Sequence, residues 1–171
     1  MTERATEIAK WVRYCMVGHG GDILDQGGDE TCPWTECEVH FACISMKVKA
    51  VVNEKDAILT IHVASPDPVK PENQGRIIDL VNRINNELSG IGGYSFSKES
   101  NRVVSKAAIP IPNGYFDMEQ LTQTFRMMVQ HMGSLSGLIE CAAESNTALE
   151  TLIDDFKREL SAAKASEDKT H

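Results

Sequence analysis

The spacing of apolar residues along the chain predicts alternating stretches of helix and strand. Over residues 2–17 apolar side chains recur every three to four positions, which is typical of an amphipathic helix; the stripe comprises Ile8, Trp11, Val12 and Cys15. Over 42–52 the period changes to two, so alternate side chains point to opposite sides of a predicted strand. A polar turn leads to a second strand over 57–64, and the two are expected to form an antiparallel hairpin.

The middle of the chain repeats this order. A helical period returns from about Glu72, and a run of glycines over 90–93 predicts its end. Alternation over 94–98 and again over 102–111 predicts another pair of strands. Asn113-Gly114 then predicts a turn.

The remaining residues are predicted to be helical. Asp117 suits the cap of a helix whose apolar stripe runs to about residue 135, and Gly133 and Gly137 predict a kink or break there. A last helical pattern lies within 138–164. The order α-β-β-α-β-β-α(-α) favours one α+β domain over 1–171, with an antiparallel sheet of about four to five strands flanked by helices.

Charge is concentrated in one glycine-rich segment. The chain holds 17 Lys and Arg against 25 Asp and Glu, a net charge of −8, yet no Lys or Arg occurs between Arg13 and Lys47. Five glycines share that interval, so 18–37 is predicted to be a long acidic loop, with a further short strand within 22–38 as the alternative. Its acids do not have the spacing of an EF-hand calcium loop.

Composition excludes several classes of protein. Hydrophobic residues make up 42% and charged residues 25% of the chain, which is typical of a globular protein. The negative net charge disfavours nucleic-acid binding, and no apolar stretch approaches the roughly 18 residues of a membrane span. The first residues lack a signal-peptide core, so we expect a cytoplasmic protein whose five cysteines are reduced.

The segment Cys32-Pro-Trp-Thr-Glu-Cys37-Glu-Val-His40 is the nearest approach to a metal or thiol site. Two thiolates and an imidazole could hold zinc, but the gap between the cysteines is wide and a fourth ligand is missing. It is also not the Cys-x-x-Cys of a redox site. Cys43 and Cys141 are predicted to be buried fillers of a strand and a helix.

No catalytic constellation emerges from the residues. Gly18-His19-Gly20-Gly21-Asp22 lacks the Lys-Ser/Thr ending of a phosphate loop, and there is no His-Glu-x-x-His. A dyad of Cys43 with His62 on adjacent strands is geometrically possible, without a third residue to orient it. The chain is therefore expected to be no enzyme and to need no cofactor.

Two features predict a binding surface instead. On the predicted sheet, one face is apolar enough to be core, whereas Phe41, Cys43, Ile58 and His62 give the other a mixed character. Met127 lies off the apolar stripe of its helix and is a candidate for an exposed contact. This mixed face and Met127 are the predicted surface for a partner or a second subunit.

Three stretches carry a resemblance to a known family: the strand end and proline-rich link IHVASP over 61–66, the helix VNRIN over 81–85, and the hairpin over 94–111 with its acidic-capped helix. Through them, residues 39–135 resemble the bacterial YbjN family, whose members share the fold of type III secretion chaperones. The segment 18–37 and the C-terminal helix have no counterpart in that pattern.

The resemblance implies a small, cytoplasmic, non-enzymatic module that is often dimeric. Family members are described as sensory or stress regulators, and chaperones of this fold bind extended segments of a partner on exposed apolar surface. The expectation is thus a homodimer that binds an unidentified protein partner. The alternative is a metal- or thiol-dependent sensor that uses Cys32, Cys37 and His40.

Overall fold

The computed structural model describes residues 2–87, 93–112 and 117–167. Its elements in chain order are α1 (Thr2–Gly18), β1 (Gly21–Gly27), β2 (Trp34–Phe41), β3 (Ile44–Asn53), β4 (Ile58–Ala64), η1 (Pro71–Asn73), α2 (Gln74–Glu87), β5 (Gly93–Ser97), β6 (Arg102–Pro110), α3 (Met118–Glu144) and α4 (Leu149–Glu167). The six strands form one antiparallel sheet in the order β1-β2-β3-β4-β6-β5. The α+β class is confirmed, with six strands instead of the predicted four to five.

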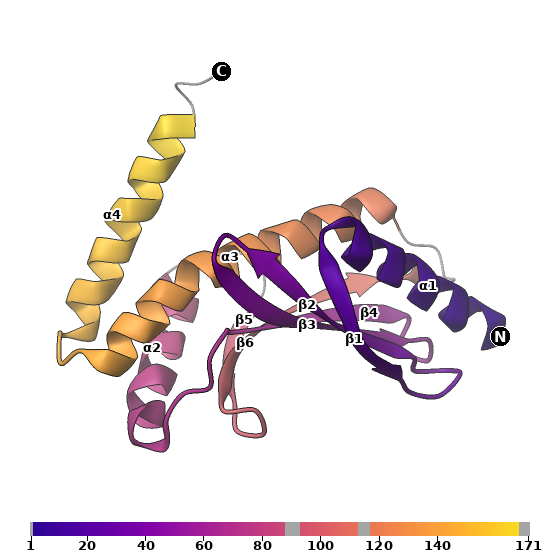
Figure 1. The fold of residues 1–171 in the computed structure, drawn as a ribbon, viewed down its shortest axis with the longest axis horizontal. Helices are drawn as coiled ribbons and strands as arrows, with labels where there is room; N and C mark the ends of the chain where they lie inside the picture. Colours follow the sequence, from indigo (N-terminus) through magenta and orange to yellow (C-terminus); the bar gives the residue numbers. More distant parts are fainter. Residues whose placement is uncertain (1, 88–92, 113–116, 168–171) are drawn as a thin grey trace.

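The sheet is covered by helices on one side. Both α1 and α3 pack against several of its strands, and Figure 1 shows them along the same face. The strand side chains that point toward them are the buried ones of the predicted hairpin, such as Met46, Val48, Leu59 and Ile61. The opposite, open face keeps half-buried and charged side chains, as antiparallel sheets with one solvated face do.

The prediction of a long acidic loop over 18–37 is wrong. That segment forms β1 and the start of β2, and the two strands pair over most of their length. Thr35, Cys37 and Val39 alternate toward the core, while the acidic side chains between them point outward. The alternative, a short strand within 22–38, is closer to the structure. The alternation of buried and exposed residues indicates a strand here, although the many glycines indicate a loop.

Gly28 and Asp29 shape the turn between β1 and β2. Gly28 adopts φ +91°, and a Cβ there would come within 2.1 Å of the Cys32 carbonyl oxygen, so the position requires glycine. The Asp29 carboxylate accepts hydrogen bonds from the Thr31 backbone, the Thr31 hydroxyl and the Cys32 backbone at 2.7–2.9 Å. These bonds lower the pKa of Asp29, which acts here as a turn former.

The predicted break of the last helices at Gly133 and Gly137 is also wrong. Helix α3 continues through both glycines for 27 residues, about 40 Å, and crosses the sheet (Figure 1). A Cβ on Gly133 would lie 2.5 Å from Cδ1 of Phe41 at the end of β2, whereas nothing lies within 4 Å of a Cβ on Gly137. Gly133 therefore permits close packing of helix on strand, and the two predicted segments 39–135 and 138–164 are joined by one helix.

Polar contacts fix the remaining elements. The Asp117 carboxylate caps α3 by accepting from the Glu119 backbone at 2.8 Å, as the sequence predicts for this residue. Helix α4 extends away from the sheet (Figure 1), and its N-terminal half is tied to α2 by Lys157–Glu87 at 2.6 Å and Arg83–Glu150 at 3.2 Å. The predicted glycine stop over 90–92 and the turn at 113–114 lie outside the described residues.

The edge strand β5 is protected by one side chain of α2. The Asn85 amide donates to the Tyr94 carbonyl at 2.7 Å and accepts from the Tyr94 N–H at 2.9 Å. It thereby occupies the outward-facing backbone groups of Tyr94, one of the positions at which a further strand would pair.

The two glycines of α3 give a matched test of the helix-on-sheet packing. Gly133→Ala is expected to lower the free energy of unfolding, because overpacking costs about 1–3 kcal/mol and the gain in helix propensity is about 1 kcal/mol. Gly137→Ala on the same helix meets nothing and should raise it by about 0.5–1 kcal/mol. Urea unfolding measures both, and equal stabilisation by the two variants would contradict the packing role of Gly133.

A second test concerns the edge of the sheet. Asn85→Ala removes both bonds to Tyr94 and should lower the free energy of unfolding by about 1–2 kcal/mol. Asn86→Ala changes the neighbouring exposed residue with the same effect on helix propensity and serves as the control. If the two variants unfold at the same urea concentration, Asn85 does not secure β5.

Candidate functional site

The predicted binding residues do not share one surface. Ile58 and His62 lie half-buried on the open face of β4, as expected. Phe41 points to the opposite, covered face and packs on Gly133, and Cys43 lies exposed in the turn between β2 and β3. The reason is the two-residue turn of Ala42, at φ 54°, and Cys43, which separates Phe41 at the end of β2 from Ile44 at the start of β3, so the predicted strand over 42–52 begins only at Ile44. Met127 is half-buried on α3.

The possible Cys43–His62 dyad does not form. His62 pairs with Lys49 of β3, six positions beyond Cys43 along that strand, or about 20 Å at the rise of an extended chain. Cys43 is exposed, and so is Cys141 on α3, which corrects the prediction that both are buried fillers.

The three residues of the alternative metal or thiol site do not converge either. Cys37 is fully buried toward the core, whereas His40 points to the other side of β2 and lies exposed, 3.8 Å from Asp22. Burial raises the pKa of the Cys37 thiol to about 12, and the charge of Glu36 acts in the same direction, so a thiolate is disfavoured. Within the described residues, no three His, Cys, Asp or Glu side chains come close enough to hold a metal ion.

The centre of the open face carries a row of nitrogen groups. Lys49, His62 and Lys106 occupy registered positions on β3, β4 and β6, and the Lys49 ammonium lies 4.0 Å from the centre of the Trp34 ring. Burial lowers the pKa of His62, and the charges of Lys106 and Lys49 lower it further. His62 is therefore neutral at neutral pH and adds no positive charge to the two lysines beside it.

A second surface lies on α1, on the side away from the sheet. Trp11, Tyr14 and Val17 are 47%, 70% and 51% exposed, and the two rings are 6.0 Å apart. The sequence placed Trp11 on the buried stripe, but that stripe consists of Ile8, Val12 and Cys15 with Met16. The recurrence of large apolar residues at 11, 14 and 17 was the signal of a separate, outward-facing stripe.

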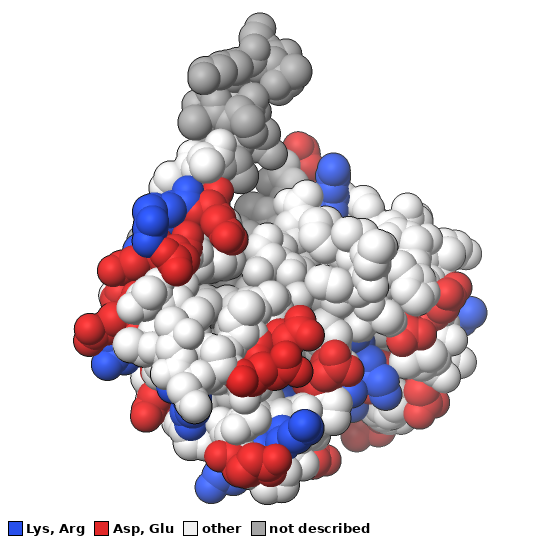
Figure 2. All heavy atoms as spheres, turned by 60° about the vertical axis from the view of Figure 1, so that its left-hand side comes forward, with Lys and Arg blue, Asp and Glu red and all other residues white. Residues whose placement is uncertain are grey.

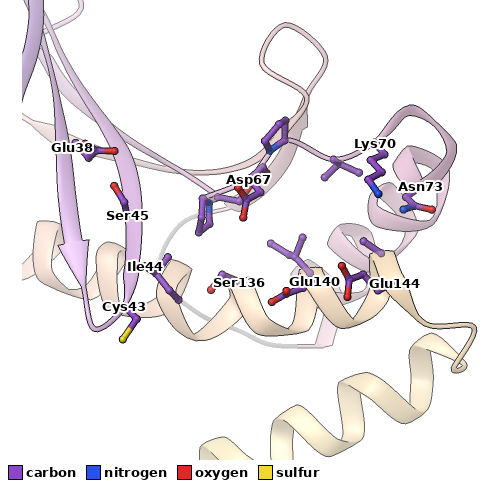
Figure 3. A pocket seen from close by; sticks show the side chains of 16 residues that line it. Glu38, Cys43, Ile44, Ser45, Asp67, Lys70, Asn73, Ser136, Glu140 and Glu144 are labelled. Atoms are coloured by element: carbon purple, nitrogen blue, oxygen red, sulfur yellow. Dashed lines mark hydrogen bonds between the residues drawn. The ribbon is translucent and has the colours of Figure 1, made fainter.

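A groove lies where the β2–β3 turn, the linker after β4 and the C-terminal half of α3 meet. It has a volume of about 840 Å³, within the range of ligand-binding pockets. Figure 3 shows its lining side chains, with Glu38 and Ser45 on one side, Asp67 and Lys70 on the linker side, and Glu140 on α3. Because three segments far apart in the sequence form it, no local motif could have predicted it.

The groove combines apolar and acidic surface. Its apolar residues are Ile44, Pro66, Pro68, Val69, Ile139 and Ala143. Its four carboxylates, on Glu38, Asp67, Glu140 and Glu144, face a single lining cation, Lys70. The Ser45 hydroxyl is buried without a hydrogen-bond partner among the described residues. Such a lining offers a ligand both apolar contact and negative charge.

Comparison with known proteins adds no family. Neither the models of known protein families nor the curated proteins contain a match to this chain. Of the helices in the described residues, none combines the length and apolar character needed to cross a membrane.

The position of His62 predicts a pH dependence of stability. Because the pKa of His62 is lower in the folded chain, the unfolded chain takes up the proton first as pH falls below about 6.5, and folding is weakened there. The free energy of unfolding should therefore be kept above about pH 6.5 and decline as the pH falls below it. Urea unfolding of His62→Gln should show a flatter profile; identical profiles would mean that His62 is not the group responsible.

Proposed function

We propose that the protein is a non-enzymatic protein-interaction module, chaperone-like or regulatory, which acts as a homodimer and binds a protein partner on exposed apolar surface. The observation that carries this proposal is the outer face of α1. Of the five large apolar side chains exposed in the described residues, three lie together there, on Trp11, Tyr14 and Val17. Apolar residues gathered on one patch, unlike scattered ones, are typical of interaction sites.

The chemistry of this face suits contact with another protein chain. Tryptophan and tyrosine are enriched among the residues that contribute most to interface affinity, because each buries a large area and loses few rotamers. The α1 helix can also present them rigidly, since its other side is held in the core by Ile8, Val12 and Met16. We assign the contact between two copies of the chain to this face.

Light scattering over a dilution series tests the assignment. At high micromolar concentration the wild type is expected to have about twice the mass of one 18.9 kDa chain. The variant Trp11→Ser/Tyr14→Ser should dissociate at a concentration at least about tenfold higher, since truncation of such residues costs about 1–2 kcal/mol each. Both side chains are exposed, so the variant should keep the wild-type fold.

Ile58→Ser is the control, because Ile58 lies half-buried on the open face of the sheet, away from α1. It should leave dimerisation unchanged. A wild type that stays monomeric throughout the series would contradict the homodimer. Dissociation by Ile58→Ser alone would move the contact to the open face and contradict the role of α1.

A further inference from the structure

On the α3 side of the groove, two glutamates carry like charges close to each other. Glu140 and Glu144 are both exposed and stand four positions apart, so their like charges repel each other. They also lie in the last two turns of α3, where the helix dipole disfavours negative charge, and the last turn carries no basic residue. The nearby Arg76 is engaged with the backbone, where it donates to the carbonyls of Ala142, at 2.7 Å, and Thr147.

The opposite walls add two more carboxylates, on Glu38 and Asp67. Glu38 stands in register with Lys47, whose ammonium pairs with Glu36, and none of the four groove carboxylates forms an ion pair with a described residue. Other acids of the chain do find partners: Glu36, two positions from Glu38, pairs with Lys47 at 3.7 Å. The unmatched carboxylates thus converge on one cavity. Figure 2, with the side of α2 and α4 turned forward, shows acidic side chains gathered in groups between uncharged surface.

The groove also has an apolar part, which could contact apolar side chains of a ligand. Ile44 at the start of β3, Ile139 of α3 and Val69 of the linker are among its lining residues. Ile139 and Val69 are each 6% exposed, so they are held in place by the core. The Ser45 hydroxyl beside Ile44 is buried and has no hydrogen-bond partner among the described residues.

We propose that this groove binds a cationic segment of a partner protein, in which apolar side chains alternate with lysine or arginine. The apolar side chains lie on Ile44, Val69 and Ile139, and the cations reach the carboxylates on the walls. Binding then supplies the positive charges that Glu140 and Glu144 lack in the free protein. This proposal rests on the proposed role as a protein-interaction module and assigns the partner a place separate from the α1 face.

The same charges exclude other occupants. Phosphate groups of a nucleic acid or an anionic membrane are repelled by four carboxylates. A metal ion lacks three converging ligands within the described residues. A free alkylamine, like a lysine side chain, combines an alkyl chain with an ammonium group. The experiment therefore includes an alkylamine as a competitor.

The probe is a short fluorescein-labelled peptide of alternating leucine and lysine, titrated at low salt and followed by fluorescence anisotropy. Two further peptides carry glutamate in place of lysine, or serine in place of leucine, and should bind at least about tenfold more weakly. Octylamine is added as a competitor. If it displaces the peptide at equal concentration, a small amine is the occupant and the proposal of a peptide is overturned.

The protein variants separate the groove from the general negative charge of the chain. Glu140→Gln/Glu144→Gln should weaken binding of the leucine–lysine peptide about tenfold, from two partly exposed charge contacts. Glu99→Gln/Glu159→Gln removes the same charge from exposed positions outside the groove and should change the affinity less than about twofold. Equal weakening in both double variants would mean that the peptide follows only the net charge of −8.

Two measurements complete the test. The methyl resonances of Ile44 and Ile139 should shift on addition of the peptide, and shifts confined to other regions would overturn the assigned site. Trp11→Ser/Tyr14→Ser should retain peptide binding. A failure of dimerisation and a failure of the groove are thereby observed separately, and the thermal melting of the glutamine variants, which lose only repelling charges, should not fall.

Discussion

The close contact of Phe41 with Gly133 sets the position of the longest helix on the sheet. The phenyl ring fills the space that a Cβ on Gly133 would occupy, so α3 can approach the end of β2 closely while its other residues cover β3, β4 and β6. One long helix thereby covers most of one face, and α1 covers the rest. The groove depends on the same contact, because the β2–β3 turn and the C-terminal half of α3 meet just beyond it.

Strands β3 to β6 and helix α2 could be predicted from the sequence because their side-chain periods are regular. β3, β4, β5 and β6 follow the predicted alternation, and α2 follows its predicted stripe of Ile77, Leu80, Val81 and Ile84. The errors concern glycine. Glycines at 27 and 28 allow a turn between two strands, and Gly133 allows packing, yet in a sequence all of them indicate flexibility. Only the neighbours in space distinguish these roles.

The candidate sites were harder to predict because they depend on which face a residue occupies. Phe41 and Ile58 are both apolar strand residues. Because the chain turns at Ala42, Phe41 belongs to β2 and points to the covered face, whereas Ile58 points to the open face of β4. The groove unites residues more than 70 positions apart. Its carboxylates are no different in sequence from Glu36 or Glu87, and only the structure shows that those two have cations beside them.

The net charge of −8 therefore has two distinct parts. On the open face, Glu36 of β2 stands in register with Lys49 and forms an ion pair with Lys47 at 3.7 Å, so this acid is matched within the sheet. In the groove, Asp67, Glu140 and Glu144 form no ion pair with a described residue, and the proposed ligand would supply the missing positive charge. A single rigid helix links this groove to α1, since the Cys15 thiol lies 3.7 Å from the Thr122 hydroxyl near the start of α3. From Thr122 to Glu140 the helix spans about 27 Å. That separation lets a second copy on α1 and a segment in the groove bind without competing, so both proposed contacts can be occupied in one complex.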